Sequence, residues 1–204
     1  MSVVSPVYLF IGVVSWPFVF GLYRLRATGL EHLPAGGFVL AANHTSNFDP
    51  WAIGMPLFPR RQVRFMAKAE LFNPVLGPIL RAGGTFKVRR GEGDREAMRT
   101  ATELVTQGEI VVMFPEGTRR EKGLRKRHVA RPHSGAARIA LAAGAPLVPA
   151  AIAGTERLSR LGPLRVGYGE PLDLSDLGGL ETKRAAAAAT DRLMARIEEL
   201  RASL

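Results

Sequence analysis

The chain has 204 residues, enough for one domain with a substantial buried core. It contains no cysteine, which excludes disulfides, thiolate metal sites and cysteine nucleophiles and fits a reducing compartment. Its formal net charge of +10 predicts an anionic partner such as nucleic acid, phospholipid head groups or a phosphorylated substrate.

The first 23 residues carry no charged side chain, and Arg24 and Arg26 follow them at once. An apolar run of roughly 20 residues can cross a bilayer, although Pro6 and Pro17 interrupt this one. The basic start and the cleavage site of a secretory signal are missing. We therefore expect residues 1–23 to be a membrane-anchoring segment, spanning or interfacial, on the cytoplasmic face of the cell membrane. The alternative is a core helix of a soluble protein.

Beyond this segment, apolar strands alternate with helices. Strands are predicted at 38–42, 63–67, 85–88, 110–114, 147–153 and 164–168, and helices at 50–58, 92–107, 135–143 and 182–204. This alternation predicts an α/β fold, namely an αβα sandwich with a mixed, mostly parallel sheet behind an N-terminal apolar membrane-anchoring helix. Functional sites of such sheets gather at the carboxyl ends of the strands.

The segment 43–50 carries the strongest chemical signal. His44 leaves the strand at 38–42, and Asp49-Pro50 is typical of a helix start, with Asp49 as the N-cap. A carboxylate so placed can accept from one imidazole nitrogen and leave the other free as a base. That pair is the base and orienter of a catalytic triad, and it needs no protein nucleophile. The alternative is a helix cap beside a solvated histidine.

Four segments together resemble the sequence blocks of the glycerolipid acyltransferases, the family of the lysophosphatidic acid acyltransferases. Segment 43–50 resembles the family's His-x4-Asp block, and 114–119 matches its Phe-Pro-Glu-Gly-Thr-Arg block. Segment 84–90 resembles the second block, with Arg89 in place of the usual Asp, and 148–152 resembles the fourth. The order and spacing agree with the family from about residue 28 to residue 155, which makes residues 24–204 the expected acyltransferase domain.

The resemblance implies acyl transfer from an acyl thioester, either acyl-CoA or acyl-carrier protein, to the free hydroxyl of a lysophospholipid. The simplest acceptor is 1-acylglycerol-3-phosphate, which gives phosphatidic acid, and the family implies neither a cofactor nor a metal. His44 would be the general base and Asp49 its orienter. Lys68 would stabilise the oxyanion or contact the acceptor phosphate; alternatively it is a solvated surface lysine.

The other candidate residues would bind substrate. Arg90 and Arg119 suit a phosphate because the guanidinium presents a planar fork of donors, although either could be a surface arginine. Glu116 would accept from glycerol hydroxyls or hold an arginine, or it is only a turn carboxylate. Gly117 and Thr118 would supply backbone and hydroxyl donors close to the ligand.

A basic run, with six Lys or Arg residues against one acid, occupies residues 119–127. Beside an apolar anchor we expect it to rest on anionic lipid, which contributes about 1 kcal/mol of binding free energy per basic residue.

One rival hypothesis keeps the acyl-transfer chemistry but uses glycerol-3-phosphate, another lysolipid or a glycolipid as acceptor. A rival of another class is a basic, membrane-tethered nucleic-acid-binding protein, but no nucleic-acid motif is present.

Overall fold

A computed structural model describes residues 4–69, 72–74, 76–88, 94–116 and 132–204. The strands of this part are β1 (Arg26–Thr28), β2 (Phe38–Ala42), β3 (Val63–Lys68), β4 (Thr85–Val88), β5 (Ile110–Met113), β6 (Leu147–Ala153) and β7 (Arg165–Tyr168). They form one sheet in the order β1-β7-β6-β2-β5-β3-β4. The five strands from β6 to β4 run parallel, β7 is antiparallel to β6, and β1 is parallel to β7. The prediction of a mixed, mostly parallel sheet is confirmed.

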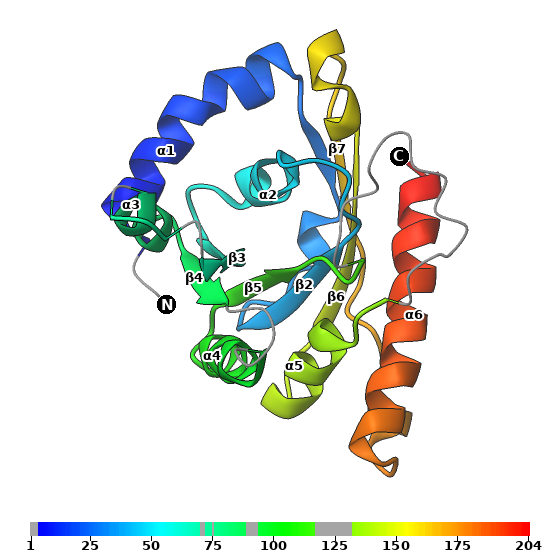
Figure 1. Cartoon of the computed structure of the whole chain (residues 1–204). Helices are drawn as coiled ribbons and strands as arrows, with labels where there is room; N and C mark the ends of the chain where they lie inside the picture. Colours follow the sequence, from blue (N-terminus) through cyan, green and yellow to red (C-terminus); the bar gives the residue numbers. More distant parts are fainter. Residues whose placement is uncertain (1–3, 70–71, 75, 89–93, 117–131) are drawn as a thin grey trace, which may run out of the picture.

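Helices cover both faces of this sheet (Figure 1). One side carries α1 (Pro6–Trp16), the π-helix η1 (Pro17–Leu22), α2 (Asp49–Gly54) and α3 (Leu76–Ala82); the other carries α4 (Asp94–Thr106), α5 (Gly135–Ala143) and α6 (Thr182–Ala202). Short 3-10 helices occupy Leu30–His32 (η2), Met55–Leu57 (η3), Thr155–Arg160 (η5) and Ser175–Leu177 (η6).

Strand β2 lies at the centre of the sheet and feeds both cores. Phe38, Leu40 and Ala42 pack in the core that includes α2, whereas Val39 and Ala41 pack in the core built with α4, α5 and α6. All five side chains are fully buried, as expected for a strand in a parallel sheet covered on both faces. The carboxyl end of β2 is therefore a rigid support for the loop that follows it.

The first helix is tied to the domain at its start and at its middle. The Ser5 hydroxyl caps α1 by accepting from the Tyr8 N–H at 3.0 Å, and the Ser5 N–H donates to Gln62 Oε1 at 2.9 Å. Midway along α1, a side chain at Gly12 would place its Cβ 2.2 Å from the Phe58 ring, so only glycine allows this approach. The inner side of α1 is thus packed against the domain.

The outer side of the N-terminal segment is apolar and exposed. Of the 13 large hydrophobic side chains exposed in the described part of the chain, eight lie between Val7 and Leu22. The most exposed are Phe10 at 70% and Val13 at 63%. Within the described ranges, no helix combines the length and the apolar character needed to cross a bilayer. The expected membrane anchor stays a prediction.

Candidate active site

The structure brings His44 and Asp49 into direct contact. His44 Nδ1 lies 2.7 Å from Asp49 Oδ2, the Asp49 side chain is fully buried, and the His44 side chain is 17% exposed. A carboxylate only accepts, so this contact places a proton on Nδ1 in the neutral imidazole and leaves Nε2 as the unprotonated nitrogen. Nε2 has no hydrogen-bond partner among the described residues. The predicted pair therefore has the geometry of a base and its orienter.

Asp49 is not the N-cap that the sequence predicts. It is the first residue of α2, and Phe48 occupies the cap position without a side-chain hydrogen bond. The Asp49 carboxylate turns back to the preceding loop, where Oδ2 accepts from the N–H groups of Thr45 at 2.7 Å and Ser46 at 2.8 Å. The same oxygen that orients His44 thus closes the loop between β2 and α2, because that loop offers it two amide donors.

The neighbouring strand β6 holds this loop from the other side. The Asn43 amide donates to the Ile152 carbonyl at 2.9 Å and accepts from the Ile152 N–H at 2.8 Å. Just beyond β6, the buried Thr155 hydroxyl lies 2.5 Å from Asp49 Oδ1 and 3.1 Å from the Thr45 hydroxyl. The pair 44/49 is therefore fixed to two strands rather than to a free loop.

Helix α2 is also held by hydrogen bonds to β7 and to α1. The Tyr168 hydroxyl, at the end of β7, donates to the Ile53 carbonyl at 2.6 Å, and burial raises the pKa of this tyrosine well above its ordinary value. Trp51 Nε1 donates to the Ser15 hydroxyl of α1 at 3.1 Å. These contacts join the helix that begins at Asp49 to both the sheet and the N-terminal helix.

The Phe-Pro-Glu segment lies beside His44, as the resemblance requires. Because β5 pairs with β2 in parallel, the residues that follow both strands leave the sheet at the same edge. The Phe114 ring stacks on the His44 ring with centroids 4.2 Å apart and an interplanar angle of 20°. Glu116 is half-buried two residues further on. The structure thus brings the first and third sequence blocks together.

The remaining predicted residues are only partly described. Lys68 is the last residue of β3, and β5 separates this strand from β2 in the sheet. Because these strands run parallel, the Lys68 backbone lies at the same edge of the sheet as His44. Strand β4 ends at Val88, two residues before Arg90. Arg90, Gly117, Thr118 and Arg119 lie outside the described residues, as does the basic run 119–127. Their roles stay predictions.

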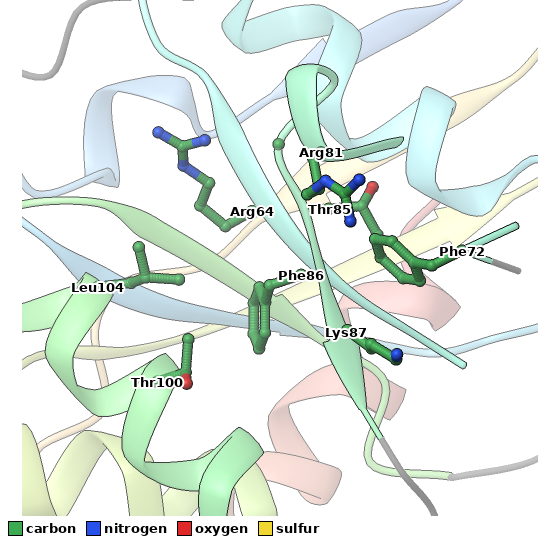
Figure 2. A pocket seen from close by; sticks show the side chains of 9 residues that line it. Arg64, Phe72, Arg81, Thr85, Phe86, Lys87, Thr100 and Leu104 are labelled. Atoms are coloured by element: carbon green, nitrogen blue, oxygen red, sulfur yellow. The ribbon is translucent and has the colours of Figure 1, made fainter. Parts of the chain in front are cut away.

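A cavity of about 260 Å³ lies away from this pair, between β4, α3 and α4 (Figure 2). Figure 2 shows Phe86 of β4 pointing toward Thr100 and Leu104 of α4. Neither His44 nor Asp49 lines the cavity.

Three contacts of the site escape analysis of the sequence: the Asn43 bridge, the Phe114 stack and the Thr155 hydrogen bond. Asn43 and Phe114 are the first residues of two recognised blocks, and that membership is the signal that points to them. Thr155 lies three residues beyond the fourth block and is 106 residues from Asp49. Only the pairing of β6 with β2 reveals that the two meet.

Comparison with known proteins identifies relatives over most of the chain. The acyltransferase family model matches residues 24–153. A 1-acyl-sn-glycerol-3-phosphate acyltransferase of Bacillus subtilis is 37% identical over 175 residues, covering 83% of this chain and 84% of the relative. A chloroplast 1-acyl-sn-glycerol-3-phosphate acyltransferase of Brassica napus is 29% identical over 71% of this chain, which spans 41% of that longer protein.

The fold has a solved counterpart. The crystal structure of a 1-acyl-sn-glycerophosphate acyltransferase of Thermotoga maritima superposes with a TM-score of 0.65. At 24% identity it covers 95% of this chain, and the match covers 78% of that protein, so it supports the α/β fold. With the family match and the Bacillus relative, the chain belongs to the acyltransferase family that includes the 1-acyl-sn-glycerol-3-phosphate acyltransferases.

Proposed function

We propose that this protein transfers a fatty acyl group from an acyl thioester to the free hydroxyl of 1-acyl-sn-glycerol-3-phosphate and so makes phosphatidic acid. The 2.7 Å contact between His44 Nδ1 and the buried Asp49 carboxylate carries the proposal, because it leaves Nε2 available to a substrate. The Bacillus and Brassica relatives, both named for this activity, support the choice of acceptor.

In the proposed reaction, His44 Nε2 takes the proton of the acceptor hydroxyl as its oxygen attacks the thioester carbonyl. The buried Asp49 carboxylate stabilises the imidazolium that forms. The tetrahedral intermediate carries an oxyanion, for which Lys68 is the proposed donor. Collapse breaks the carbon–sulfur bond, and the departing thiolate receives the proton from His44. An ester and a free thiol result, and no group outside the two substrates is consumed.

The acceptor phosphate is assigned to Arg90 and Arg119, with Glu116, Gly117 and Thr118 around the glycerol. The topology of the sheet supports this assignment. Strands β4 and β5 precede these segments and end at the same edge of the sheet as β2. The donor is acyl-CoA or acyl-carrier protein, and both carry the same thioester.

An acceptor panel tests the proposal. Purified protein is mixed with acyl-CoA or acyl-carrier protein and with 1-acylglycerol-3-phosphate, glycerol-3-phosphate, a lysolipid without a terminal phosphate or a glycolipid. We expect turnover to be fastest with 1-acylglycerol-3-phosphate. Faster acylation of another acceptor would refute the proposed acceptor but not the proposed acyl transfer.

Two histidine variants test the base. His44→Ala should lower kcat by about 10²–10⁴-fold, the usual contribution of a positioned base. The control is His32→Ala, because His32 is also partly buried but follows β1, which runs opposite to β2 and ends at the other edge of the sheet. Near-normal turnover by folded His44→Ala protein would refute the mechanism.

We further propose that the exposed apolar side of α1 and η1 lies in the bilayer interface on the cytoplasmic side. An outer face with Phe10, Val13 and Phe18 each more than half exposed suits the boundary between head groups and acyl chains. Arg24, the second residue after η1, and the basic run 119–127 suit anionic head groups. An enzyme held there meets a membrane-resident acceptor by lateral diffusion.

Vesicle co-sedimentation tests this surface. Removal of residues 1–23 is a poor test, because it would also remove the buried Val19 from the core. A triple variant with Glu at positions 10, 13 and 18 keeps the core intact and should not pellet with anionic vesicles in high salt. The control places Glu at Leu30 and Leu180, which are exposed but outside this face. Equal pelleting of both variants would refute the interface proposal.

A further inference from the structure

The hydroxyl of Thr155 is committed to the active-site pair rather than to its own helix. Thr155 is the first residue of η5, after Gly154 at the cap position, and is 2% exposed. Its Oγ1 lies 2.5 Å from Asp49 Oδ1. A threonine at a helix start ordinarily bonds to the local backbone, so this use of the hydroxyl on a residue 106 positions away calls for a reason.

Proton counting fixes the direction of each bond. An ionised carboxylate only accepts, so Thr155 donates its single hydroxyl proton to Asp49 Oδ1. The 3.1 Å contact with the Thr45 hydroxyl must then run the other way, with Thr45 as donor. One chain of hydrogen bonds therefore runs from Thr45 through Thr155 and Asp49 to His44 Nδ1.

The two oxygens of Asp49 are held very unequally. Oδ2 accepts from His44, from the Thr45 N–H and from the Ser46 N–H. Within the described part of the chain, Thr155 is the single donor to Oδ1. The terminal torsion of an aspartate is soft, so a carboxylate held at one oxygen can swing about that point. Thr155 supplies the second point of attachment.

We propose that Thr155 is a positioning residue that locks the Asp49 carboxylate and, through it, the orientation and tautomer of His44. The inference rests on the proposed function for its catalytic consequence, but the hydrogen-bond chain can be measured without substrate. The hydroxyl should matter and the methyl should not, since the chain of hydrogen bonds uses only the oxygen.

Kinetics of matched variants test the proposal. Thr155→Val keeps the shape and removes the hydroxyl; we expect kcat to fall about 10–100-fold, by analogy with the hydrogen-bond partners that orient metal-binding histidines. KM for both substrates should change by less than about threefold, because no contact with substrate is lost. Thr155→Ser should restore most of kcat. Thr190→Val is the control, because Thr190 is equally buried and donates to the Ala186 carbonyl in α6, away from the site.

A spectroscopic measurement keeps the test independent of catalysis and of the acceptor. The chain has four histidines, so side-chain ¹⁵N signals can be resolved and the His44 signal assigned by its loss in His44→Ala. We expect a single tautomer, protonated on Nδ1, in the wild type and Thr155→Ser, and mixed tautomers in Thr155→Val.

An unchanged His44 spectrum in Thr155→Val, or Thr155→Ser as impaired as Thr155→Val, would overturn the assignment. So would an equal loss of kcat in Thr190→Val. If the wild type acylates none of the acceptors, the proposed function fails while the spectra still decide the role of Thr155.

Discussion

Replacing Asp49 by asparagine or by alanine should separate the two tasks of this carboxylate. It orients His44, and it closes the loop between β2 and α2 by accepting from the N–H groups of Thr45 and Ser46. Asparagine keeps an acceptor of the same shape but carries no charge. Alanine removes the acceptor altogether.

The expected magnitudes follow from the bonds that each variant keeps. With asparagine, the amide oxygen can serve the loop and the amide NH₂ can meet the Thr155 hydroxyl, so stability should fall by only about 1–2 kcal/mol. The imidazolium loses its counter-charge, however, and kcat should fall by about 10²–10⁴-fold. With alanine, two amides, one hydroxyl and the His44 imidazole lose their acceptor, and we expect a loss of about 3–5 kcal/mol.

Two assays read these tasks separately. Denaturant unfolding gives the free energy of unfolding, and steady-state acylation at saturating substrate gives kcat. Asp49→Asn retaining more than about a tenth of wild-type kcat would refute the orienting role. Asp49→Ala proving as stable as Asp49→Asn would refute the loop-closing role. The combination of a stable, inactive Asn variant and an unstable, inactive Ala variant is the expected result.

Three further outcomes are expected. Alanine at Arg90 or Arg119 should raise KM for 1-acylglycerol-3-phosphate about tenfold or more and leave KM for the acyl donor nearly unchanged in steady-state assays; unchanged acceptor KM in both would show that neither arginine binds the phosphate. Gly12→Leu should cost about 1–3 kcal/mol of unfolding free energy by overpacking against the phenyl ring that this glycine faces, whereas Gly21→Leu, with open space around its Cβ, should cost almost nothing. Burial raises the pKa of Tyr8 from 10.0 to about 12, so its contribution to stability is complete below pH 10 and is lost as pH rises toward 12. The free energy of unfolding should therefore fall less between pH 10 and pH 12 in Tyr8→Phe than in the wild type.

Local patterns predicted most of the fold because the residues that decide each element are adjacent in sequence. The strand 38–42 and the helices 135–143 and 182–204 follow from apolar runs and helical periodicity, and the structure has them within two residues. The partners of Asp49 could not be predicted in the same way. Whether its carboxylate caps α2 or turns to the loop depends on the path of residues 44–46, which periodicity does not specify.

The order of strands in the sheet is the other feature that sequence does not specify. No pattern in the sequence predicts that β2 lies between β5 and β6 in the sheet, although the sequences of β5 and β6 are both strongly apolar. That arrangement decides which later residues reach His44, namely Phe114 after β5 and Thr155 after β6. Recognition of the sequence blocks points to the segment that begins at Phe114, although not to the stacking of its ring on His44. It gives no sign of Thr155, because that residue lies beyond the last recognised block.

The position of β6 beside β2 has a consequence for the newborn chain. The hydrogen bonds around Asp49 are complete only when residue 155 has been made and β6 has docked, because Thr155 donates to Asp49 Oδ1. Tyr23 and Thr155 are 132 positions apart, so at the usual 5–20 residues per second roughly 7–26 s pass between the synthesis of the apolar segment and that of Thr155. If the segment attaches to a bilayer as proposed, it can do so well before the residues of the candidate site have met. A ribosome stalled before residue 155 would hold a chain in which Asp49 Oδ1 lacks this donor.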